Sequence, residues 1–250
     1  MIQGLRSIRL TMELSNLPDS YWEILTSVVS GLRKTLGKNL YSCILYGSAV
    51  RSSFVAGSSD LNLLIILNES TPAAHREISR ILKRKVRIEP FVICRVGMEK
   101  SFDAFAIKFC SIKRHYQVLH GEDPLSDLVI DEKILYFVTE QALRNLRLRT
   151  VRAYINQSHD RQRYLGYLAQ ITPQVFTDIG TALRVRGFPV EKNFADRIPL
   201  LTEHLGDSAQ VLKDLLDLKK KKVMLSEEEL FLLHSKLFTL LDQTISWLSE

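Results

Sequence analysis

One run of seven residues constrains the fold of this chain most strongly. The segment Leu61–Leu67 is apolar at every position except Asn62. A short, continuous apolar run is typical of a strand that is buried on both faces, because a strand with one wet face alternates polar and apolar residues. The sequence therefore predicts a central strand with other elements packed on both of its sides.

The first half of the chain alternates between strand-like and helix-like segments. Further strands are expected at 40–46, 86–94 and 116–119, and helices at 18–36, 71–83 and 104–112. Gly47 closes the first strand, and the turn residues at 121–124 follow the last one. This alternation indicates the α/β (α+β) class.

The second half has helical patterns almost throughout. Helices are expected at 131–157, 161–186, 196–206, 207–222 and 226–249. Pro173 predicts a break or a kink in the second of these helices. Ser226 followed by Glu229 is a capping-box pattern at the start of the last helix. We therefore expect two domains, a mixed one at 1–125 and an all-α one at 126–250.

The composition is that of a soluble globular protein, with 46% hydrophobic and 25% charged residues. No apolar run approaches the roughly 20 residues of a membrane span, and the N-terminus lacks the apolar core of a signal peptide. We therefore expect a cytoplasmic protein without a membrane partner. Cys43, Cys94 and Cys110 are too dispersed for a disulfide framework or a metal site.

The net charge of +6 favours an anionic ligand such as a nucleotide. Four arginines spread over one broad face of the helix expected at 131–157: Arg144, Arg147, Arg149 and Arg152. Such a face is either a phosphate or nucleic-acid surface or a solvated face that pairs with acids. We favour the second interpretation, so nucleic acid is not an expected partner.

The sequence between the first two strands contains the residues with the clearest chemistry. Gly47 permits a sharp turn, after which the Ser48 hydroxyl and nearby N–H groups are placed to hold phosphate oxygens. Asp60 and Asn62 are two residues apart at the start of a strand, so they project from the same face. Glu89 is a charged residue in an otherwise apolar strand. Mg²⁺ prefers oxygen ligands of this kind, together with substrate phosphates.

This pattern resembles a known family. Gly-Ser, a loop of about a dozen residues, Asp-x-Asn before apolar residues, and a later acid in a strand are similar to the signature of the DNA polymerase β-like nucleotidyltransferase superfamily. The stretch LYGSAVRSSFVAGSSDLNLLI is most similar to bacterial aminoglycoside nucleotidyltransferases and their uncharacterised relatives. The resemblance covers roughly residues 16–125.

The resemblance implies a fold, a reaction and a set of site residues. The fold is a mixed sheet with flanking helices, followed by a helical bundle. The reaction is Mg²⁺-dependent transfer of a nucleoside monophosphate from ATP or another NTP to a hydroxyl of a small molecule or protein. The implied catalytic and metal-binding residues are Asp60, Asn62 and Glu89; the implied nucleotide-binding residues are Gly47, Ser48, Arg51 and Ser59.

Two departures from the family pattern bear on activity. Asn62 replaces the second metal carboxylate, which removes one negative charge from the site. Lys108 stands where relatives often have an acid. We therefore expect impaired turnover, and a catalytically inactive nucleotide-sensing or partner-binding (antitoxin-like) module remains an alternative. A homodimer is also left open.

Overall fold

The computed structural model describes residues 17–51, 54, 56–57, 59–83, 87–191, 193–220 and 224–250. Two sequence interpretations concern residues outside these ranges. They are the absence of a signal peptide at the N-terminus and the end of the helix expected at 207–222. The chain divides into two compact units, Met1–Val129 and Ile130–Glu250. Residues 126–129 thus belong to the first unit, whereas the sequence interpretation assigns them to the second domain.

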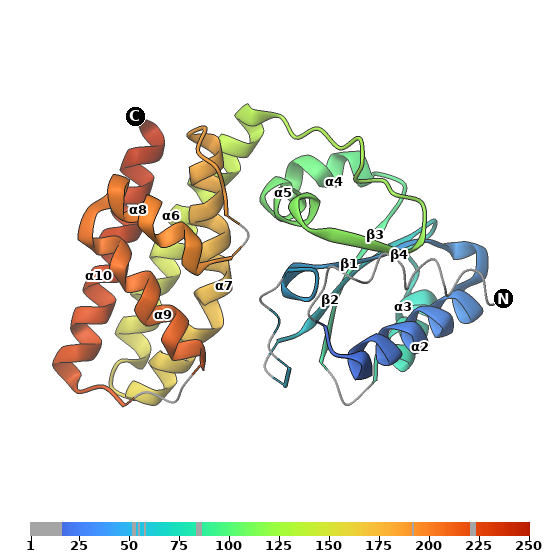
Figure 1. The fold of residues 1–250 in the computed structure, drawn as a ribbon, viewed down its shortest axis with the longest axis horizontal. Helices are drawn as coiled ribbons and strands as arrows, with labels where there is room; N and C mark the ends of the chain where they lie inside the picture. The colour runs from blue at the N-terminus through green and yellow to red at the C-terminus, as the bar shows by residue number, and fades with distance from the viewer. Residues whose placement is uncertain are drawn as a thin grey trace. The chain divides into compact units, whose positions relative to one another are not determined.

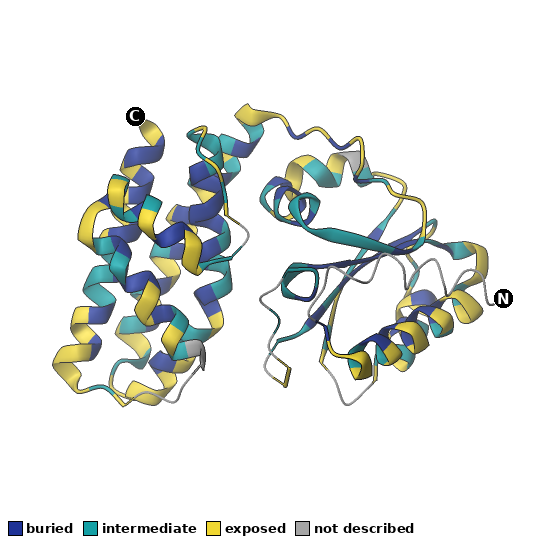
Figure 2. Ribbon diagram, viewed as in Figure 1, coloured by how far each residue is buried: buried dark blue, intermediate teal, exposed yellow. Residues whose placement is uncertain are grey.

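A four-stranded mixed sheet forms the centre of the first unit (Figure 1). Its strands are β1 (Leu40–Tyr46), β2 (Leu61–Leu67), β3 (Ile88–Cys94) and β4 (Tyr116–Gly121). The strand order is β3-β2-β1-β4, with β1 antiparallel to both β2 and β4, and β2 parallel to β3. Strand β2 is interior and is buried at every residue but Asn62, and its ribbon is mostly dark blue in Figure 2. The predicted central strand is confirmed.

Helices cover both faces of this sheet (Figure 1). They are α2 (Asp19–Leu36) and α3 (Pro72–Leu82) on one face, and α4 (Met98–Ala104) and α5 (Ala106–Arg114) on the other. Leu63 and Ile65 share a buried core with α2 and α3. On the opposite face, the Phe91 ring lies 5.7 Å from that of Phe109. Side chains alternate along a strand, so β2 supplies apolar residues to both layers.

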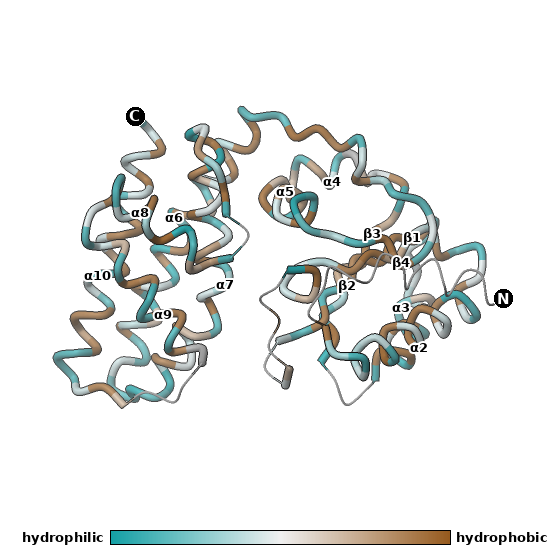
Figure 3. Tube along the Cα trace, in the orientation of Figure 1, coloured by the Kyte–Doolittle hydropathy of each residue, from teal (hydrophilic) through white to brown (hydrophobic). Residues whose placement is uncertain are grey.

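In the second unit, the described residues form helices and connecting turns but no strand. The α-helices are α6 (Glu132–Gln157), α7 (Arg161–Val185), α8 (Ile198–Leu205), α9 (Val211–Lys220) and α10 (Glu227–Ser249). Buried apolar residues between Leu143 and Leu248 form one core, and Figure 3 shows the apolar positions of these helices in brown. The mixed sheet with flanking helices and the helical C-terminal region confirm the predicted fold class.

Of the break or kink expected at Pro173, the break does not occur in helix α7. The helix runs through this proline without a break. Thr172 and Val175 are fully buried on either side of it, so tertiary packing holds the helix together despite the missing N–H donor. A short 3₁₀ segment, Gly206–Gln210, also replaces the first turn of the helix expected at 207–222.

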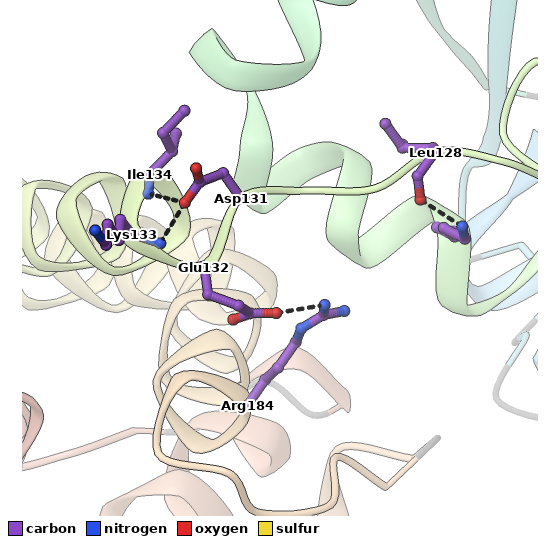
Figure 4. Close-up of polar contacts among 7 residues, drawn as sticks. Leu128, Asp131, Glu132, Lys133, Ile134 and Arg184 are labelled. Atoms are coloured by element: carbon purple, nitrogen blue, oxygen red, sulfur yellow. Dashed lines mark hydrogen bonds and ion pairs between the residues drawn. The ribbon is translucent and has the colours of Figure 1, made fainter.

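Side-chain contacts fix the chain on either side of the boundary between the units (Figure 4). In the first unit, Lys113 Nζ donates to the Leu128 carbonyl oxygen at 2.5 Å. In the second unit, the Asp131 carboxylate caps α6 by accepting from the Lys133 and Ile134 N–H groups. Glu132 pairs with Arg184 of α7 at 3.0 Å. Each unit therefore holds its own end of the connection.

The predicted capping box is confirmed at the start of α10. The Ser226 hydroxyl accepts from the Glu229 N–H at 3.2 Å, and the Glu229 carboxylate accepts from the Ser226 N–H at 2.8 Å. None of the cysteines, which all lie in the described part of the chain, forms a disulfide. In the same ranges, no helix is both long and apolar enough to cross a membrane.

Candidate functional site

One end of the sheet gathers the residues that the sequence singled out. Strand β1 ends there, and β2 and β3 both begin there because they run parallel to each other and antiparallel to β1. Asn62 is the register partner of Tyr46 on one side and of Glu89 on the other. Partners in register project from the same face of a sheet, and Asp60 shares that face at the strand start. The topology thus groups Asp60, Asn62 and Glu89.

The Gly47 turn packs closely against this group. The residues Gly47–Ala49 form a single 3₁₀ turn directly after β1, and Gly47 has a φ of 82°, which favours glycine. A Cβ atom at position 47 would lie 3.1 Å from Asn62 Nδ2. Both the backbone conformation and this close approach therefore explain the glycine. They place Ser48 beside the start of β2.

Arg87 joins the two carboxylates of the group. Its Nε lies 3.1 Å from Asp60 Oδ1 and 2.9 Å from Glu89 Oε1, so one guanidinium contacts both side chains. The Arg87 side chain is 72% exposed, so these are surface ion pairs. The hydrogen bond to Glu89 and the charge of Asp60 raise the pKa of Arg87. The guanidinium is therefore a fixed positive charge between the two acids.

Lys108 of α5 brings a second cation to the same face. Its Nζ lies 4.9 Å from the centre of the Tyr46 ring and 5.7 Å from that of Phe91. Desolvation by these surroundings lowers the pKa of Lys108, while the charge of Glu89 raises it. Burial and the charge of Glu89 raise the pKa of Tyr46. Lys108 thus belongs to the candidate site.

The remaining residues predicted to bind nucleotide lie near the turn. Arg51 follows it and donates its N–H to the carbonyl oxygens of Gly47 and Ser48. Burial lowers the pKa of the Arg51 guanidinium, and the charge of Arg114 lowers it further. Two guanidinium groups therefore act on each other close to the turn. Ser59 is partly buried in the bend that leads into β2.

The donors predicted for Mg²⁺ are of the right chemical kind. Asp60 and Glu89 offer carboxylate oxygens and Asn62 offers an amide oxygen, and Mg²⁺ is often held by one or two carboxylates plus substrate phosphates. The described ranges contain no group of three His, Cys, Asp or Glu side chains that could hold a metal ion. Both carboxylates also form ion pairs with Arg87. The set fits a metal in ligand type, but Arg87 already compensates part of its negative charge.

The arginine face of α6 is largely paired within the second unit. Arg144 contacts Glu140 at 2.7 Å, and Arg147 contacts Asp242 at 3.0 Å. Arg149 donates to Gln174 at 3.0 Å. These contacts agree with the interpretation of this face as one that pairs with its own neighbours.

Arg87 and Arg114 are the site residues that the sequence interpretation missed. A signal existed for Arg87, because it precedes Glu89 by two residues and alternation places both side chains on one face. For Arg114 there was no such signal, since it affects Arg51 through its charge and lies far from it in the sequence.

Comparison with known proteins adds little to this description. A spectinomycin adenyltransferase from Enterococcus faecialis, solved with ATP and spectinomycin, is similar to this chain with a TM-score of 0.48 and 16% sequence identity. The similarity covers 88% of this chain and 99% of that chain. No protein-family model and no curated protein matches the sequence. The assignment of the candidate site therefore depends on the residues and geometry of this chain alone.

Proposed function

We propose that this chain binds a nucleoside triphosphate at the end of its sheet and transfers the nucleoside monophosphate, at a low rate, to a hydroxyl of a small molecule or protein. The observation that carries the proposal is the grouping of Asp60, Asn62 and Glu89 beside the Gly47 turn. Glu89 lies 27 residues after Asn62 in the sequence, and the pairing of β2 with β3 brings it beside Asp60 and Asn62.

Each residue has a role in this proposal. The turn at Gly47 and Ser48 and the guanidinium of Arg51 bind phosphate oxygens. Glu89 Oε1 accepts the proton of the attacking hydroxyl, as a general base must lie within hydrogen-bond reach of its substrate. Asp60, Asn62 and Glu89 would hold Mg²⁺, which when bound stabilises the negative charge that develops on the phosphates.

A non-catalytic, nucleotide-sensing module is the second candidate. Its support is the charge balance of the site, since Asn62 is neutral and Arg87 pairs with both acids. A site whose negative charge is reduced in this way attracts a divalent cation weakly but leaves the phosphate-binding turn intact. In this case the chain binds a nucleotide and communicates its presence to a partner.

The decisive experiment measures ATP binding and pyrophosphate release with Mg²⁺ across a panel of hydroxyl acceptors. Asp60→Ala and Glu89→Ala are expected to abolish any release, because they remove the general base or its partner acid. Asn62→Asp restores one negative charge, and we expect it to tighten Mg²⁺-ATP binding about tenfold, which corresponds to about 1.4 kcal/mol. Calorimetric titration and a coupled pyrophosphate assay provide the measurements.

The matched control is Asn68→Asp, which makes the same change at the opposite end of β2, where the Asn68 amide donates to the Lys38 carbonyl oxygen. It should not alter nucleotide binding. Binding without pyrophosphate release would favour the sensing module. If neither the wild type nor Asn62→Asp binds ATP, nucleotides have no place in the function of this chain.

A further inference from the structure

The carboxylates of the candidate site already have cations of their own. Asp60 and Glu89 contribute two negative charges. Arg87 contacts both through the same nitrogen, at 3.1 and 2.9 Å. The Lys108 ammonium lies on the same face of the sheet, over the rings of Tyr46 and Phe91. Two monovalent cations thus accompany two carboxylates, which is the charge that one divalent ion would supply.

The backbone sets this arrangement. Arg87 directly precedes β3, and its carbonyl oxygen accepts from the Leu61 N–H at 3.1 Å, so the main chain at position 87 is tied to the start of β2. From that position, the alternation along the strand directs Arg87 and Glu89 to the same face. The position of the main chain therefore brings the guanidinium to both Asp60 and Glu89. The two contacts do not depend only on the flexibility of a long side chain.

We propose that Arg87, with Lys108 beside it, is the built-in counter-ion of Asp60 and Glu89 and competes with divalent metal ions for these two carboxylates. Arg87 Nε contacts one oxygen of each carboxylate, and its positive charge repels a metal ion that approaches either group, so the guanidinium and the metal ion compete. The inference rests on the proposed function only for the identity of the site. It explains how the two acids persist at one sheet end next to Asn62, which lacks the charge to help hold a metal.

The test is a titration of the full chain with Mn²⁺ in the absence of nucleotide. The electron paramagnetic resonance signal of the free ion measures how much Mn²⁺ remains unbound. Arg87→Gln removes the charge, and we expect it to tighten Mn²⁺ binding on the order of tenfold, since like charges so close repel appreciably even near a surface. Adding Asp60→Asn to this variant should return the affinity to the wild-type value. An affinity of Arg87→Gln that equals that of the wild type would overturn the proposal.

Arg80→Gln is the matched control, because Arg80 is an exposed arginine of α3 in the same unit and also pairs with one acid, Glu77, at 2.7 Å. Equal tightening in this variant would also overturn the proposal, since the effect would then come from net charge alone. Lys108→Gln provides a second variant should Arg87→Gln fail to fold, and a smaller tightening is expected. No change in Lys108→Gln would remove Lys108 from the proposal.

The Mn²⁺ titration and the ATP titration can reject the two proposals independently of each other. Tighter Mn²⁺ binding in Arg87→Gln together with no ATP binding in any variant would support the counter-ion and reject the proposed function. ATP binding by the wild type with no effect of Arg87→Gln on Mn²⁺ would do the reverse.

Discussion

Asp178 of α7 is a buried carboxylic acid, and its surroundings disfavour the charged form of the side chain. The residue is 3% exposed, and its carboxylate accepts a hydrogen bond from Gln174 at 3.2 Å. Burial raises the pKa of Asp178 from 3.8 to about 6, although Gln174 and the charge of Arg149 act in the opposite direction. A buried carboxylate of this kind costs stability when it ionises.

We therefore predict that Asp178 makes the stability of the chain depend on pH. The folded state holds this proton more tightly than the unfolded state, so the free energy of unfolding falls as the pH rises from about 4 to about 6. The fall is on the order of 3 kcal/mol, because one pKa unit corresponds to about 1.4 kcal/mol. Asp178→Asn should remove this dependence and be the more stable protein at pH 7.5.

Urea unfolding between pH 4 and pH 8 measures this effect. The exposed Asp207→Asn in the same unit is the control and should keep the wild-type profile. An Asp178→Asn profile parallel to that of the wild type would contradict the prediction.

At the scale of elements, α7 shows how a helix accommodates a neighbouring segment. Arg197 is 3% exposed, and it donates to the carbonyl oxygens of Phe176 and Glu191 at 3.0 and 2.8 Å. A Cβ atom at Gly180 would lie 2.7 Å from the Arg197 guanidinium. Gly180 thus gives the buried arginine its space, whereas Gly166 of the same helix faces open space.

We predict opposite effects for the two glycines. Gly180→Ala should lower the free energy of unfolding by about 1–3 kcal/mol, the usual range for overpacking a tightly packed interior. Gly166→Ala should raise it by up to about 1 kcal/mol, because alanine is the better helix former. Chemical denaturation of both variants measures the difference, and equal signs would show that Arg197 gives way without cost.

At the scale of the whole molecule, the two units have separate cores. The apolar cluster of the first unit contains residues between Leu17 and Leu119. The cluster of the second contains residues between Leu143 and Leu248. No residue belongs to both clusters among those that the structure describes, so each unit buries its own apolar surface.

We accordingly predict that residues 130–250 fold without the first unit. The fragment should keep its helical circular-dichroism signal and melt in one cooperative transition. Phe176→Ala in the fragment should cost about 3–5 kcal/mol, since Phe176 is 1% exposed in this core. A gradual, non-cooperative melt of the unmodified fragment would mean that the helical unit needs the rest of the chain.

The sequence alone predicted the α/β class, the buried strand Leu61–Leu67 and the capping box of α10, because these depend on periodicity and on residues close in sequence. It left a break or a kink open at Pro173, and the structure excludes the break, since buried neighbours outweigh a local preference. It also named Asp60, Asn62 and Glu89. Their grouping depends on which strands lie side by side, and only the tertiary structure decides that.

The charge of the candidate site was likewise decided by the tertiary structure. The sequence showed that Asn62 is neutral and that Lys108 carries a positive charge. It did not show that Arg87 joins both remaining acids or that Lys108 lies on their face. Electrostatic interactions depend on distances of a few ångströms, and these are fixed only when β2, β3 and α5 pack together.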